Sequence, residues 1–266
     1  MQALVIDTAD LSGWAVRLWW PVLRIGGFVS SAPVLNSTTV PPRIKIVLTL
    51  ALAFLLAPSI TVPAALSIFS GPGVLAAVRE LAIGIAIGMV VQVAFEAFTL
   101  AGQMVAITMG LGFATLIDPQ RGANTTVMGQ LFMILAVLTY LSMDGHLMLL
   151  GALANSYVGV PIGGAGVDRN LWLTVGLLGG RIFETGLLIA LPAVIALILI
   201  NIALGVVTRA APQLNLFGIG FPITLFAGFL VLYAGMDGVM SGISIVIHGA
   251  LTAVVNLVAA RAPAVP

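Results

Sequence analysis

The stretch RAAPQLNLFGIGFPITL, residues 209–225, interrupts sequence that is otherwise apolar enough to span a membrane. Pro212 and Pro222 each lack a backbone N–H donor. Gly218 and Gly220 permit backbone angles that other residues avoid. A straight helix is therefore not expected here. Because non-helical backbone at membrane depth persists only where it is buried in protein or lines a wet cavity, the stretch predicts a functional break in a membrane helix.

The composition places the chain among membrane proteins. Of its 266 residues, 61% are hydrophobic and 7% are charged, and the mean hydropathy is +1.20. In soluble domains about a quarter of the residues are charged. Ten basic and nine acidic residues, with no run of either sign, provide no electrostatic footprint for nucleic acid. The absence of cysteine excludes disulfides, thiolate metal sites and cysteine nucleophiles, and we expect no cofactor.

The N-terminal segment is acidic rather than basic, so we expect no cleaved signal peptide. Asp10 is expected to be the N-cap of a first helix over residues 11–31, where the helix dipole favours a carboxylate. The sequence Trp19-Trp20-Pro21 fits an interfacial aromatic belt and a helix kink. Arg17 and Arg24 are expected to extend from this helix to the membrane interface.

The apolar segments predict an all-α, polytopic membrane protein with one domain, residues 1–266, and about six to eight helices. The segments are residues 11–31, 44–57, 74–117, 127–154, 171–208, 216–234 and 239–260. Two of them are too long for one crossing, which needs roughly 20 residues. Each is either a helical hairpin or one long helix that projects beyond the bilayer, and Pro192 is a possible kink in the second.

Small residues recur at four-residue spacing, which places them along one helix face. One set is Gly102, Ala106, Gly110 and Ala114, and a shorter one is Gly84 and Gly88. Such faces let two helices approach closely, and close packing drives helix association in lipid. Packing within the chain and packing between subunits both remain possible readings.

Ionisable residues inside apolar segments are costly, and they are expected to be paired or functional. Glu96, Arg181 and Glu184 are the candidate buried charges. Arg181 and Glu184 are three residues apart and can pair on one helix face. Glu96 has no cation nearby in sequence, so it must meet an arginine elsewhere, face water or be protonated. Glu80 stands only at the edge of its segment.

No constellation in the sequence predicts catalysis, and we expect a protein that is not an enzyme. Asp144-Gly-His146 is the one place where a carboxylate and an imidazole lie close together, and residues two apart do not share a helix face. A turn or an interface location is the favoured reading there. Asp237 lies in Gly235-Met-Asp-Gly238, which lacks the glycine that precedes the aspartate in intramembrane aspartyl proteases.

Three separated motifs resemble the FliR family of flagellar type III export-gate subunits. The first runs from Ser31-Ala-Pro-Val-Leu-Asn36 through Val40-Pro-Pro-Arg-Ile-Lys45. The second is Met109-Gly-Leu-Gly-Phe-Ala-Thr-Leu-Ile-Asp-Pro119. The third runs from Arg209 to Thr224. With Gly145-His-Leu147 and the Leu191-Pro192 helix, the resemblance covers nearly the whole chain, and residues after about 235 match only in being hydrophobic.

The resemblance implies a role for two groups of residues. In the family the second motif lies at the centre of the gate, and its bulky apolar residues help to plug the closed pore, which here implies Phe113, Leu116, Ile117 and Met109. Relatives commonly carry phenylalanine at positions 116 or 117, so plugging here rests more heavily on Phe113. The helix-break signature comprises Arg209, Pro212, Gln213, Asn215, Phe217, Gly220 and Pro222.

The resemblance also implies partners and a location. It implies assembly with FliP-like and FliQ-like subunits, contact with an FlhB-like subunit, unfolded exported proteins as substrates, and a multi-pass location in the bacterial inner membrane within the flagellar basal body. The injectisome export gate, the SctT class, is the close alternative because it shares the Ala-Pro-Gln-Leu-Asn core at residues 211–215. A small-molecule secondary transporter is a further alternative, since broken helices and Glu96 suit one.

Overall fold

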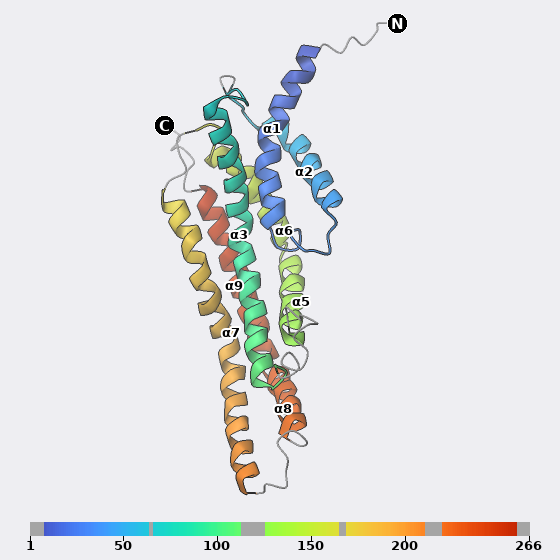
Figure 1. Cartoon of the computed structure of the whole chain (residues 1–266), viewed down its shortest axis with the longest axis vertical. Coiled ribbons are helices and arrows are strands. Elements are labelled where there is room, and N and C mark those ends of the chain that lie inside the picture. The colour runs from blue at the N-terminus through green and yellow to red at the C-terminus, as the bar shows by residue number, and fades with distance from the viewer. Residues whose placement is uncertain (1–7, 64–65, 113–125, 165–168, 211–219, 260–266) are drawn as a thin grey trace. The chain divides into compact units, whose positions relative to one another are not determined.

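A computed structural model describes residues 8–63, 66–112, 126–164, 169–210 and 220–259, and every regular element in these ranges is helical (Figure 1). The eight described α-helices are α1 (Thr8–Ser31), α2 (Pro42–Leu56), α3 (Gly71–Thr108), α5 (Val127–Ser142), α6 (Gly145–Gly159), α7 (Arg169–Ala210), α8 (Phe221–Ala234) and α9 (Met236–Ala259). A short 3-10 helix, Ala57–Ser59, follows α2. The prediction of an all-α polytopic fold is confirmed.

Four described helical segments are long and apolar enough to cross a membrane, or five if α5 and α6 together form one broken span. They are Pro42–Ser59, Gly71–Thr108, Gly180–Ala210 and Met236–Val258. The protein is therefore a multi-pass membrane protein.

The two overlong apolar segments are single helices rather than hairpins. Helix α3 has 38 residues and α7 has 42, with Pro192 inside α7. At 1.5 Å per residue, they extend for about 57 Å and about 63 Å, roughly twice the hydrocarbon thickness of a bilayer. Each helix is long enough to project well beyond the hydrocarbon core.

Two predicted boundaries differ from the structure. Helix α1 begins at Thr8, so Asp10 lies in its first turn and is not the N-cap. The apolar segment 127–154 is two helices, because the chain turns after Ser142 and Asp144 takes a left-handed conformation with φ 54°. The turn predicted at Asp144 is confirmed.

The described residues divide into two compact units. Unit one holds the described parts of residues 1–92, 146–176 and 250–266, and unit two holds those of 93–145 and 177–249. Helices α3, α6, α7 and α9 contribute residues to both units. The single domain over residues 1–266 stays a prediction.

In unit one, α1 lies directly against the first half of α3. Gly84 and Gly88 of α3 face the α1 backbone so closely that a Cβ at Gly84 would overlap the carbonyl oxygen of Arg24. The large apolar side chains of this crossing, including Ile25 and Phe28, are almost fully buried. The Gly84 and Gly88 face therefore packs within the chain. Helix α2 lies beside α1 (Figure 1).

In unit two, α3 packs against α5 and α7. Phe95 stacks edge-on against Tyr140 of α5, with ring centroids 5.5 Å apart. A Cβ at Gly102 would lie 2.7 Å from the Cα of Gly129, and one at Gly186 would lie 2.9 Å from the carbonyl oxygen of Ala97. Gly102 thus serves packing within the chain, which answers for this residue the question that the sequence left open.

Candidate functional site

Helix α3 ends in a Schellman motif. The N–H of Leu111 donates to the carbonyl of Ala106 at 2.9 Å, and the N–H of Gly110 donates to that of Ile107 at 3.0 Å. Both hydrogen bonds define this C-terminal motif, which requires a left-handed residue after the helix. Gly110 supplies it with φ 85°, a conformation in which glycine has no Cβ penalty.

Side chains from two other helices bind the last carbonyl groups of this end. Asn201 of α7 donates its Nδ2 proton to the carbonyl oxygen of Thr108 at 2.9 Å. The hydroxyl of Thr224 in α8 lies 3.3 Å from the carbonyl oxygen of Met109 and 2.9 Å from that of Phe221. The carbonyl groups that a helix end leaves without intrahelical partners are therefore met by α7 and α8.

Tight packing holds the same end against α8. Met109 is fully buried, and a Cβ at Gly228 would lie 2.6 Å from its Cγ and Cε atoms. The ring of Phe221 lies so close to Gly110 that a Cβ there would be 3.2 Å from the ring. We call the set Thr108, Met109, Gly110, Asn201, Phe221, Thr224 and Gly228 the α3 junction; it joins the second sequence motif to the end of the third.

The α3 junction corrects one prediction about the small-residue face. Gly110 was expected on the same helical face as Gly102 and Ala106, but α3 ends at Thr108 and Gly110 lies beyond it. Gly110 is therefore small for a different reason, namely its backbone conformation and the neighbouring Phe221 ring. Ala106 is fully buried.

Part of the predicted site lies outside the described residues. These are the plug residues Phe113, Leu116 and Ile117, the face residue Ala114, and the signature residues Pro212, Gln213, Asn215 and Phe217. Helix α7 ends at Ala210 and α8 begins at Phe221, so the described helices stop on either side of the predicted break.

The remaining signature residues have clear local roles. Arg209 is exposed in the last turn of α7, where a cation interacts favourably with the helix dipole. Gly220 is buried directly before α8. Pro222 lies in the first turn of α8, where no N–H donor is needed.

The candidate buried charges are exposed in this chain. Glu96, Arg181 and Glu184 all lie on outward faces of α3 and α7 in the chain by itself, and their burial by lipid or partner subunits stays a prediction. The reason is geometric, since the faces opposite them carry the apolar contacts. Arg181 and Glu184, both described, form no ion pair with each other, although they line one pocket.

A fully buried ion pair in unit one was not predicted from the sequence. Arg24 was expected to extend to the interface, but its side chain is 0% exposed and its Nε lies 2.7 Å from Oε2 of Glu80. Its other nitrogens donate to the carbonyl oxygens of Ser156 at 2.8 Å and Val160 at 2.8 Å. The guanidinium also lies over the Tyr157 ring, 4.3 Å from its centroid. Arg24 therefore links α1, α3 and the end of α6.

Two weak sequence signals could have found these residues. Asn201 is a lone amide within the apolar run Ile198-Leu-Ile-Asn-Ile202, and Arg24 is a cation inside the first apolar segment, as is Arg17. Polar groups in such places need buried partners. Their partners are distant in sequence, so only the fold identifies them.

The polar groups of the α3 junction form hydrogen bonds between helices. Among the described residues, no three or more His, Cys, Asp or Glu side chains gather where a metal ion could be held. The polar groups of the α3 junction are amide, hydroxyl and backbone carbonyl groups. These groups hold helices together and fix where the chain leaves α3.

Comparison with known proteins identifies the family. Residues 15–249 match the family described as "Bacterial export proteins, family 1". Flagellar biosynthetic protein FliR of Escherichia coli strain K12 is 39% identical over 88% of this chain and 89% of its own length. The FliR protein of Pectobacterium carotovorum is 39% identical over 86% and 87%, and that of Bacillus subtilis strain 168 is 28% identical over 81% and 84%. The chain therefore belongs to the bacterial export protein family that contains FliR.

Proposed function

We propose that this chain forms part of the conduit through which unfolded flagellar proteins cross the bacterial inner membrane. Membership in the FliR family makes it a flagellar export-apparatus subunit. The observation that carries the further step is the α3 junction, because it fixes the point from which the chain continues into Phe113, Leu116 and Ile117. We infer that these apolar side chains plug the closed conduit.

An apolar plug suits a conduit that must stay closed to ions. A hydrophobic constriction blocks water and ions by dewetting and gives way to a passing polypeptide. A plug must also be held in place, and the Schellman motif, the Asn201 hydrogen bond and the buried Met109 anchor the residues directly before it. We infer that Met109 helps to hold the plug in place and does not itself block the conduit, because its side chain packs against Gly228.

We propose FliP-like and FliQ-like subunits as partners, together with an FlhB-like subunit, in the flagellar basal body. Support comes from the amount of apolar side chain that the single chain leaves exposed, including Leu55, Leu75 and Phe183 at 71%, 72% and 65%. Lipid or partner subunits must cover such surface. In this function the chain is not an enzyme, and the free energy for export comes from other components.

The proposal is tested by purifying the tagged chain in mild detergent from its native bacterium and identifying its companions by mass spectrometry. We expect stoichiometric recovery of FliP-like and FliQ-like proteins. Recovery with injectisome components instead would assign the chain to that related machine. A stable homo-oligomer without companions would contradict the proposal and favour a small-molecule transporter.

A further inference from the structure

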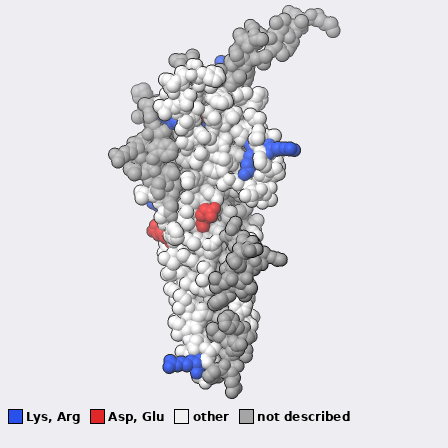
Figure 2. Space-filling view, in the orientation of Figure 1, with Lys and Arg blue, Asp and Glu red and all other residues white. Residues whose placement is uncertain are grey.

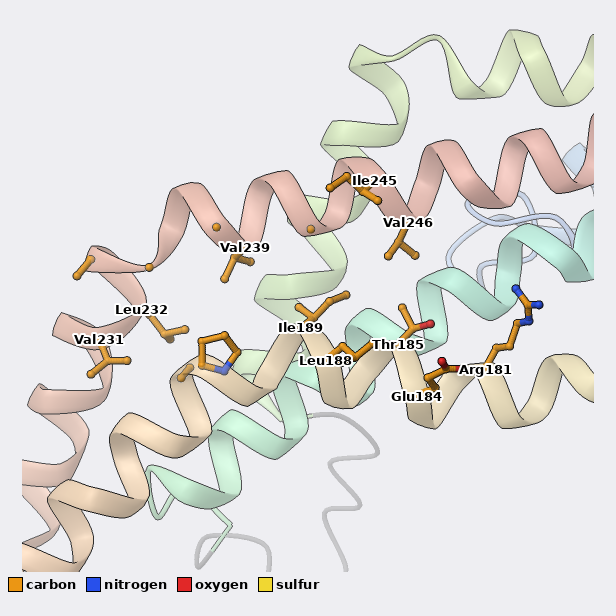
Figure 3. A pocket seen from close by; sticks show the side chains of 16 residues that line it. Arg181, Glu184, Thr185, Leu188, Ile189, Val231, Leu232, Val239, Ile245 and Val246 are labelled. Carbon is orange, nitrogen blue, oxygen red and sulfur yellow. The ribbon is translucent and has the colours of Figure 1, made fainter.

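A pocket of about 890 Å³ lies among α7, α8 and α9 of unit two (Figure 3). Its polar end is formed by Arg181, Glu184 and Thr185 of α7. Apolar side chains of all three helices line the remainder, and Figure 3 shows Val231 and Leu232 at the end opposite the charged pair. The volume falls in the range of sites that bind small molecules. We call it the α7–α9 pocket.

The length of the α7–α9 pocket corresponds to one leaflet of a bilayer. Its lining residues on α7 run from Arg181 to Ala193, and the eleven residue steps from Arg181 to Pro192 rise by about 16 Å. Half of the hydrocarbon core is about 15 Å thick. Residues 185–208, which follow Glu184, carry no charge and are long enough for one crossing. The polar end therefore lies where a bilayer spanned by this stretch would have its headgroup region.

The charges at the polar end fit a zwitterionic headgroup. Arg181 and Glu184 are both described and exposed, lie about one helical turn apart and form no ion pair with each other. A lipid phosphate would accept hydrogen bonds from the guanidinium, and a primary ammonium would donate to the carboxylate. A headgroup with a phosphate but no amine would leave Glu184 facing negative charge, and a quaternary amine has no N–H to donate.

We propose that the α7–α9 pocket binds a phospholipid whose headgroup carries both a phosphate and a primary amine, as in phosphatidylethanolamine. Arg181 binds the phosphate, Glu184 binds the ammonium group, and an acyl chain lies along the apolar walls toward Leu232. Burial of the acyl chain against these walls supplies the apolar part of the affinity. The bound lipid would then contact both α7 and α9 along the length of the pocket.

The test reconstitutes the full chain in vesicles of equal parts phosphatidylethanolamine and phosphatidylglycerol and counts retained lipids by native mass spectrometry. We expect the wild type to retain phosphatidylethanolamine in preference. Glu184→Gln should lower that preference by about tenfold, the scale of one lost charge-assisted hydrogen bond. Arg181→Gln should lower retention of both lipids. Arg43→Gln, a change at an exposed arginine of α2 outside the pocket, should leave retention unchanged.

A second pair of variants tests the apolar part without touching the charges. Gly238 lines the pocket on α9 and has open space where a Cβ would lie, so Gly238→Leu should fill the pocket and abolish preferential retention. Gly249→Leu is the matched control, because Gly249 is also on α9 with open space beside it but lies outside the pocket. Equal helical content by circular dichroism would show that both variants fold.

Three results of the retention measurements would overturn the proposal, and release of a partner subunit is a fourth. The three are equal retention of the two lipids by the wild type, an unchanged preference in Glu184→Gln, and retention by a folded Gly238→Leu variant. If a partner helix occupies the pocket in the native assembly, Gly238→Leu would release that subunit during purification while the number of retained lipids stays the same, which would also overturn it.

Discussion

At the scale of single residues, the burial of Arg24 and Glu80 is costly, because both charges are removed from water. Both side chains are 0% exposed, and moving two charges out of water costs several kcal/mol each before their attraction is counted. The cost is offset because the guanidinium also meets the carbonyl groups of Ser156 and Val160 and the face of Tyr157. The pair therefore specifies how α1, α3 and α6 meet in unit one.

Removing one partner of this pair is expected to destabilise unit one strongly. Arg24→Met leaves the Glu80 carboxylate buried without its cation, which should lower the free energy of unfolding by about 3–5 kcal/mol. The double variant Arg24→Met/Glu80→Met should recover much of the loss. Thermal unfolding in mild detergent measures both, with Arg43→Met as the control at an exposed arginine of α2. An unchanged midpoint in Arg24→Met would contradict the prediction.

Phe113 is the residue whose change should open the closed gate. Phe113→Ala removes the largest side chain of the inferred plug, so ion leak through the assembled gate should rise, and a rise of about tenfold corresponds to a barrier lowered by about 1.4 kcal/mol. Assembly should be normal, as judged by co-purification. Phe69→Ala is the control, since Phe69 is 96% exposed. Wild-type conductance in correctly assembled Phe113→Ala complexes would refute the plug role.

At the scale of elements, glycine sets how closely the helices approach. Gly84 and Gly88 admit α1 against α3, and Gly102 admits α5. In lipid the hydrophobic effect does not drive helices together, so such van der Waals contact supplies much of the free energy of helix association. Gly110 differs, because its left-handed backbone and the Phe221 ring both exclude a side chain. A large residue at 110 would distort the α3 junction itself and would not report on contacts between subunits.

The α1–α3 crossing gives a prediction with an internal control. Gly84→Ala places a methyl group against the Arg24 carbonyl, and because backbone cannot move aside cheaply, the loss of stability should reach the upper end of about 1–3 kcal/mol. Gly151→Ala in α6 has open space at the same position and should keep or raise stability by up to about 1 kcal/mol through helix propensity. Thermal unfolding of both purified variants tests this prediction. Equal unfolding midpoints would mean that α1 and α3 are less tightly packed at Gly84 than described.

At the scale of the whole molecule, the exposed apolar surface explains why this chain is expected to assemble with partner subunits. Figure 2 shows a face whose described residues include few charged side chains, and large apolar side chains are exposed on several described helices. Helices of about 57 Å and 63 Å exceed the hydrocarbon core, so parts of that apolar surface extend beyond lipid. Partner subunits are the natural cover for those parts, which is why co-purification is the decisive measurement.

The sequence by itself determined the class of fold and the positions of most helices. Low charge and long apolar segments leave helices as the available way to satisfy backbone groups in lipid, and the turn at Asp144 could be predicted because it depends on local sequence. The three motifs sufficed to identify the family, because each is a short, unbroken string of residues.

Only the tertiary structure decided which distant residues meet. Hydropathy could not tell a hairpin from one long helix in α3 and α7, because both readings are compatible with the same long apolar sequence. The Arg24–Glu80 pair spans 56 positions and the Asn201–Thr108 hydrogen bond spans 93, and no local pattern encodes such partners. Whether a small residue faces a neighbouring helix, as Gly102 does, or ends its own, as Gly110 does, depended on where α3 stops, and that in turn rests on contacts with α7 and α8.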